Sequence, residues 1–203
     1  MDSLIRFSRG IDALNTWIGR ISAWAIMVAI LVSALNALIR KAFGVSSNAW
    51  LELQWYLFGA VFMLCAAWTL ANNEHIRIDI VSSRLSDRSR NVVEMIGHFL
   101  FLLPFAALLT YLSWPFFWNS YRSGEVSNSA GGLIIWPAKL LILAGFALLL
   151  VQWLSEVIKR VAVMQGRIAD AHQAAGHQAA AEAEAERLLA ATGHKSDGAA
   201  VES

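Results

Sequence analysis

The chain has 203 residues, of which 57% are hydrophobic and only 15% are charged. A soluble domain carries about 25% charged residues, so this composition favours a membrane protein. The formal net charge of +1 gives no sign of a nucleic-acid-binding surface. The single cysteine excludes an internal disulfide and a cysteine-rich metal site.

Four apolar segments have about the 20 residues or more that a helix needs to cross a bilayer. They cover about residues 21–39, 50–71, 92–117 and 133–154. The first is too long for the apolar core of a signal peptide, and no small-residue cleavage site follows it, so we expect it to be retained. We therefore predict an all-α membrane protein with four transmembrane helices.

The first segment carries a ladder of small residues at every fourth position: Ala25, Ala29, Ser33 and Ala37. Residues four apart share one face of a helix, and small side chains let another helix approach closely. This face either packs within the chain's own bundle or docks on a partner protein.

The second segment has Glu52 about one turn from its start and leads into the polar stretch NNEHIRIDIV, residues 72–81. In an extended chain, His75, Arg77 and Asp79 would share one face, with isoleucines on the other. A short helix lying in the membrane interface would also suit this pattern. The stretch is either an interfacial segment that contacts lipid or a partner, or an ordinary basic loop.

The connection between the third and fourth segments, residues 120–132, is rich in Gly, Ser and Asn. This composition predicts a flexible connector, or alternatively a contact with another protein. The fourth segment has Lys139 about two turns from its start, at the same side of the membrane as Glu52. Charges inside a membrane are usually paired. Glu52 and Lys139 therefore pair with each other, contact another subunit separately, or meet solvent at the interface.

Lysine and arginine gather in the N-terminal stretch, in the loop between the second and third segments, and after the fourth segment. The positive-inside rule then places both termini in the cytoplasm. Residues 165–203 are rich in Ala and Glu and poor in large apolar side chains. We expect a mobile cytoplasmic tail there, after a membrane domain of residues 1–164.

Two stretches, LELQWYLFGAVFMLCAAWTLANNEHIRIDIV and NSAGGLIIWPAKLLILAGFALLLVQWLSEVIK, resemble the small permease subunit of tripartite ATP-independent periplasmic (TRAP) transporters, the DctQ-like family. The resemblance covers about residues 11–161. Its matching positions are Glu52 early in the second span, Gly59–Ala60 within it, the His-x-Arg-x-Asp sequence at residues 75–79, and Trp136–Pro137 at the start of the fourth span.

The resemblance implies a non-enzymatic subunit in the bacterial inner membrane, without cofactor or metal. It would support a large DctM-like permease in ion-coupled uptake, with sodium as the expected ion. A DctP-like periplasmic binding protein would deliver the substrate, an organic acid. Membrane lipids are the remaining partner, and no nucleic acid is expected. The candidate contacts with a partner or with lipid are Glu52, His75, Arg77, Asp79 and Lys139.

Two other classes remain open on the residues alone. A four-helix electron-transfer protein could hold haem between His75 and His98, although this needs histidines that face each other at matched depth. A membrane scaffold without a transport partner would share every feature except the resemblance. A hydrolase or transferase is not expected, because no nucleophile lies near a base and no paired acidic site is visible.

Overall fold

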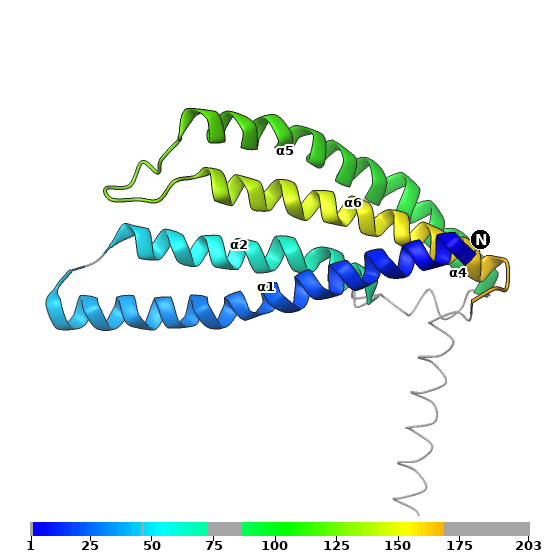
Figure 1. The fold of residues 1–203 in the computed structure, drawn as a ribbon, viewed down its shortest axis with the longest axis horizontal. Coiled ribbons are helices and arrows are strands. Elements are labelled where there is room, and N and C mark those ends of the chain that lie inside the picture. The colour runs from blue at the N-terminus through cyan, green and yellow to red at the C-terminus, as the bar shows by residue number, and fades with distance from the viewer. Residues whose placement is uncertain (1, 46, 73–86, 169–203) are drawn as a thin grey trace, which may run out of the picture. The chain divides into compact units, whose positions relative to one another are not determined.

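The computed structural model describes residues 2–45, 47–72 and 87–168, and every structural statement below concerns these residues (Figure 1). The elements in chain order are α1 (Asp2–Phe43), α2 (Asn48–Ala71), α4 (Asp87–Gly97), η1 (His98–Leu102), α5 (Leu103–Ser123) and α6 (Trp136–Met164). Four helical runs in this part of the chain are long and apolar enough to cross a membrane. The prediction of an all-α protein with four membrane helices is confirmed.

The chain divides into two compact units, Met1–Val161 and Ala162–Ser203. The first unit contains the helices discussed here. The second includes the last residues of α6 and a turn at Gly166, whose φ is 69°. The predicted interfacial segment and most of the predicted tail lie outside the described residues.

Helix α1 begins far ahead of the predicted apolar segment, because hydropathy marks only its membrane core. Its buried positions include Ser8, Asn15, Ser22, Ala29 and Asn36, each seven residues after the last. A heptad repeat of this kind keeps one seam of a helix against its neighbours. The helix ends at a glycine with a positive φ of 66°, Gly44, whose N–H donates to the Arg40 carbonyl at 3.0 Å. Glycine adopts this left-handed conformation without steric cost.

The third span runs from α4 through a π-helical turn, η1, into α5. In the π turn, the N–H of Leu103 donates to the carbonyl of His98, five residues earlier. Pro104 follows directly and has no N–H to give to a regular helix, so a widened turn accommodates it. The indole Nε1 of Trp153 on α6 donates to the same His98 carbonyl at 2.9 Å. This bond joins α6 to the third span where that span is irregular.

Helix α2 lies between the C-terminal half of α1 and α6, and α5 lies beyond α6 (Figure 1). Two glycines allow the close approaches on either side of α2. A Cβ placed on Gly19 of α1 would lie 2.7 Å from the Cβ of Trp68, and one placed on Gly145 of α6 would lie 2.7 Å from the Cβ of Met63. No heavy atom lies within 4 Å of a Cβ built on Gly59. The packing of α2 therefore depends on Gly19 and Gly145.

Candidate functional site

The first polar site is a hairpin between α5 and α6 that is fastened to α2. Both carboxylate oxygens of Glu52 accept hydrogen bonds from the hairpin: Oε1 from the Ser127 hydroxyl, and Oε2 from the Leu133 N–H at 2.6 Å. Glu52 is buried although it lies only one turn inside α2. A carboxylate in this position compensates for its burial by accepting two hydrogen bonds.

The hairpin also holds itself together through its backbone. Val126 and Ile134 form an antiparallel bridge, and the Ser127 N–H donates to the Leu133 carbonyl at 2.9 Å. Two further side chains of α2 reach it: Asn48 Nδ2 donates to the Ala130 carbonyl at 3.0 Å, and the Tyr56 hydroxyl to the Ile134 carbonyl at 3.1 Å. The sequence-based expectation of a flexible connector differs from this structure, because hydrogen-bonding partners on α2 order the polar residues.

Lys139 has a partner of its own in the hairpin. Its Nζ lies 2.5 Å from the Glu125 carboxylate and 4.2 Å from the centroid of the Phe116 ring. The hydrogen bond from Lys139 holds the pKa of the Glu125 carboxyl below its ordinary value. The interpretation in which Glu52 pairs with Lys139 is therefore wrong. Hydropathy placed both residues on one side of the membrane but could not show that the hairpin supplies each with a different partner.

A second polar site lies between the N-terminal half of α1 and the C-terminal half of α6, and its centre is Asp12. One carboxylate oxygen of Asp12 accepts from Ser155 Oγ at 2.7 Å and from Gln152 Nε2 at 2.8 Å. Gln152 in turn accepts from Asn15 Nδ2 at 2.7 Å, and the hydroxyls of Ser8 and Ser155 lie 2.7 Å apart. The side chains of Ser8, Asn15, Gln152 and Ser155 are fully or almost fully buried.

Charged residues extend this second site, the Asp12 cluster, along α6. Lys159 Nζ lies 3.1 Å from the second oxygen of Asp12 and 2.5 Å from Glu156, so one cation forms ion pairs with two carboxylates. The next residue, Arg160, is buried and pairs with Glu94 of α4. Buried charges are tolerated only when they are paired in this way. The cluster ties α6 to α1 on one side and to α4 on the other.

The Asp12 cluster was not predicted from the sequence. Asp12 and Glu156 lie outside the apolar segments, so hydropathy does not predict that they are buried. A usable signal was present on α6, where Gln152, Ser155, Glu156 and Lys159 occupy one helix face at spacings of three and four residues. The polar face of α1 formed by Ser8, Asp12 and Asn15 would have matched it.

The small-residue ladder divides between two environments. Ala29 is fully buried and Ala25 half-buried, whereas Ser33 and Ala37 are exposed. The N-terminal half of the ladder, Ala25 and Ala29, thus packs within this chain. Its outer half, Ser33 and Ala37, is not covered by any other described residue. The remaining predicted contact residues lie outside the described residues: His75, Arg77 and Asp79. The structure therefore does not test the hypothesis that His75 is a haem ligand.

Comparison with known families decides between the remaining classes. Residues 27–163 match the family described as tripartite ATP-independent periplasmic transporters, DctQ component. The chain belongs to this family. The match spans residues 27–43 of α1, all of α2 to α5 and nearly all of α6, so it includes the α6 half of the Asp12 cluster but not the α1 half. No curated protein and no solved structure matched the chain.

This DctQ component is accordingly a multi-pass membrane protein and a non-enzymatic part of a permease. It functions in a tripartite complex with DctM and DctP components. The family decides against an electron-transfer protein and against a scaffold without a transport partner, which the residues alone had left open.

Proposed function

We propose that this DctQ component supports sodium-coupled uptake of an organic acid, which its DctM partner transports and its DctP partner delivers. The family match is the observation that carries this proposal. The two polar sites support an accessory role, because their polar groups bond to one another at the levels of the two ends of α2. Asn15 lies one turn beyond Gly19, which meets Trp68 in the last turns of α2. Glu52 lies in the second turn at the opposite end of α2.

A carrier normally places polar groups near the middle of the bilayer, where substrate and ion bind. Here the middle of the bundle is packed by contacts such as Gly145 against Met63. We therefore assign substrate and ion binding to the DctM partner. The uptake experiment uses proteoliposomes with all three components, and compares a sodium gradient with an equal potassium gradient. We expect organic-acid accumulation only with all three components and sodium. Accumulation by this chain alone, or equal uptake with potassium, would contradict the proposal.

We also propose that the hairpin of residues 124–135 is the periplasmic contact of this subunit with its partners. Glu52 and Lys139 then act indirectly, by holding the hairpin in one conformation. At the other membrane face, His75, Arg77 and Asp79 are proposed to contact lipid or DctM, and the exposed outer half of the small-residue ladder to pack against a DctM helix. This placement requires both termini in the cytoplasm, as the distribution of Lys and Arg predicts. The family supports the inner membrane of a bacterium as the location.

The orientation can be measured by labelling single cysteines with a membrane-impermeant maleimide in a Cys65→Ser background. Asn128→Cys in the hairpin should react from the periplasmic side. Arg167→Cys should react only after the membrane is opened. Labelling of Arg167→Cys in intact spheroplasts would contradict the proposed orientation.

A further inference from the structure

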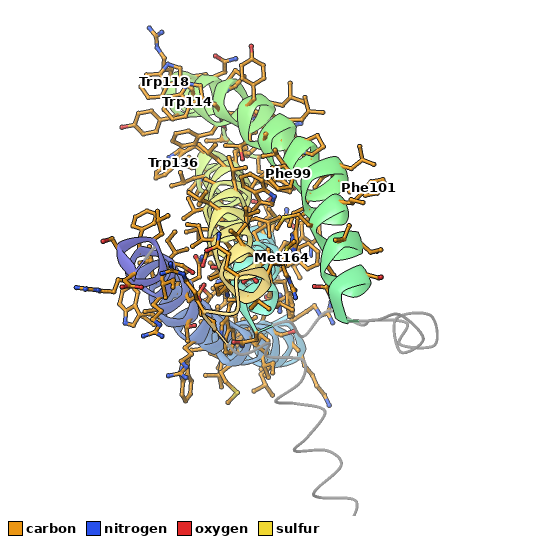
Figure 2. The ribbon with its side chains drawn as sticks, turned by 90° about the vertical axis from the view of Figure 1, so that its right-hand side faces the viewer. Phe99, Phe101, Trp114, Trp118, Trp136 and Met164 are labelled. Atoms are coloured by element: carbon orange, nitrogen blue, oxygen red, sulfur yellow. The ribbon has the colours of Figure 1, made fainter. Side chains whose placement is uncertain are left out.

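Aromatic rings gather on an exposed face at the C-terminal end of α5. The rings of Trp114 and Trp118 are nearly parallel, with centroids 6.1 Å apart, and Tyr121 continues the stack 5.9 Å from Trp118. Trp136 of α6 supports Tyr121 edge-on at 5.5 Å. Figure 2 shows Trp114 and Trp118 together at this end of α5, with Trp136 nearby on α6. Despite these contacts, Trp114, Trp118 and Tyr121 are each 41–56% exposed.

One cation lies on the same helix face. Arg122 follows Trp118 by four residues, which places the two side chains one turn apart on one side of α5. Arg122 is exposed, and no carboxylate pairs with it in the described part of the chain. It lies in the last turn of the helix, directly before the polar hairpin. The guanidinium is therefore at the level where an apolar helix leaves the bilayer.

We propose that Trp114, Trp118, Tyr121 and Arg122 form a binding site for one phospholipid molecule of the leaflet that this end of α5 reaches. Arg122 binds the lipid phosphate, because a guanidinium offers two parallel N–H donors to phosphate oxygens. The solvent-exposed parts of the Trp118 and Trp114 rings lie one and two turns deeper. There they contact the glycerol backbone and the first part of an acyl chain, since indole rings favour this boundary layer.

Two features of this face fit a lipid as its occupant. The third span is the least buried of the four candidates: 6% of its most apolar window is buried, against 17–28% in the others. In Figure 1, α5 lies at the edge of the helices, with α6 between it and α2. The order of chemistry along the face, apolar rings and then a cation, also matches the order of a phospholipid from acyl chain to phosphate. This inference goes beyond the proposed transport function and does not depend on it.

The test measures binding of brominated phosphatidylglycerol to the purified full-length chain in detergent micelles, by quenching of tryptophan fluorescence. We expect Arg122→Gln to weaken the apparent affinity about fivefold, the usual effect of one basic residue at an anionic lipid surface. The matched control is Arg40→Gln, which removes an exposed cation from the last turn of α1 at the same end of the helices. This control should bind like the unaltered chain.

Two further measurements identify the ligand. Brominated diacylglycerol with the same acyl chains lacks the phosphate, and should bind the unaltered chain as weakly as Arg122→Gln binds the phospholipid. Millimolar inorganic phosphate should not displace the lipid. Equal affinity of the unaltered chain and Arg122→Gln for the phospholipid would overturn the proposal, as would equal affinity for the phospholipid and diacylglycerol. Displacement by inorganic phosphate would show a site for free anions instead.

Discussion

At the scale of single residues, Glu52 has the clearest structural role in this protein. It is the buried carboxylate to which the hairpin donates both a hydroxyl and a backbone N–H. A buried N–H that loses its acceptor costs about 1–3 kcal/mol. The conformation of the hairpin therefore depends on one side chain from a helix more than 70 residues earlier.

We expect Glu52→Leu to loosen the hairpin, because leucine retains the volume and removes both acceptors. Hydrogen exchange at the Leu133 amide should accelerate about tenfold, as the loss of 1–3 kcal/mol implies. The matched control is Glu125→Leu, since Glu125 is partly exposed and an exposed ion pair contributes little to stability. Unchanged exchange at Leu133 in Glu52→Leu would show that the backbone bridge alone orders the hairpin.

The pKa of Glu125 gives the hairpin a defined response to acid. Its lowered pKa means that the folded state favours the ionised carboxyl, so this contribution to stability is fully present above the ordinary value of 4.5. The contribution is lost as the pH falls through the lowered pKa. Unfolding measured between pH 6 and pH 3 should therefore show a smaller acid-induced loss of stability in Glu125→Gln than in the unaltered chain. Parallel pH profiles for the two proteins would contradict this.

At the scale of helices, two glycines set the distances of α2 from its neighbours. Gly19→Ala and Gly145→Ala should each lower stability by about 1–3 kcal/mol, the usual cost of overpacking. Gly145→Ala should be the more severe, because its Cβ would also lie 2.8 Å from the Met63 backbone oxygen, which cannot rotate away. Thermal unfolding in detergent measures both effects.

The controls for these substitutions are Gly10→Ala in α1 and Gly59→Ala in α2, where a Cβ meets no atom within 4 Å. Alanine favours a helix by up to about 1 kcal/mol over glycine, so these variants should be unchanged or slightly more stable. An equal loss of stability in all four variants would contradict the proposal that Gly19 and Gly145 are needed for close helix packing.

Helices α1 and α6 are joined by buried hydrogen bonds. Gln152→Leu should destabilise the protein by about 1–3 kcal/mol, because it leaves Asn15 without its partner and removes one bond to Asp12. The double variant Asn15→Leu and Gln152→Leu should lose less than the sum of the two single variants, since no amide is then left unpaired. Strict additivity in denaturant unfolding would show that the two side chains are not coupled.

At the scale of the whole molecule, assembly with DctM tests the role of His75, Arg77 and Asp79. A specific contact predicts that Arg77→Ala or Asp79→Ala reduces co-purification of DctM more than Arg84→Ala or Arg88→Ala does. The two controls remove the same charge as Arg77→Ala, Arg84 from the same connection and Arg88 from the start of α4. A lost ion pair at an exposed site changes stability by only about 0–1 kcal/mol, so the effect should appear in assembly and not in unfolding. Equal, small effects in all four variants would indicate an ordinary basic loop.

The four membrane helices and the family could be predicted from the sequence, because the hydropathy of a span and the order of residues along it are local properties. The positions of Glu52 and Lys139 within apolar segments also predicted that both residues need partners. The identity of those partners, the start of α1 at Asp2, and the cluster of Asp12, Gln152 and Lys159 are visible only in the folded structure. These features join residues as much as 147 positions apart, as in the Ser8–Ser155 pair. Such pairs form only when folding brings two helices to the same depth with their polar faces opposed, a condition that no single segment of the sequence contains.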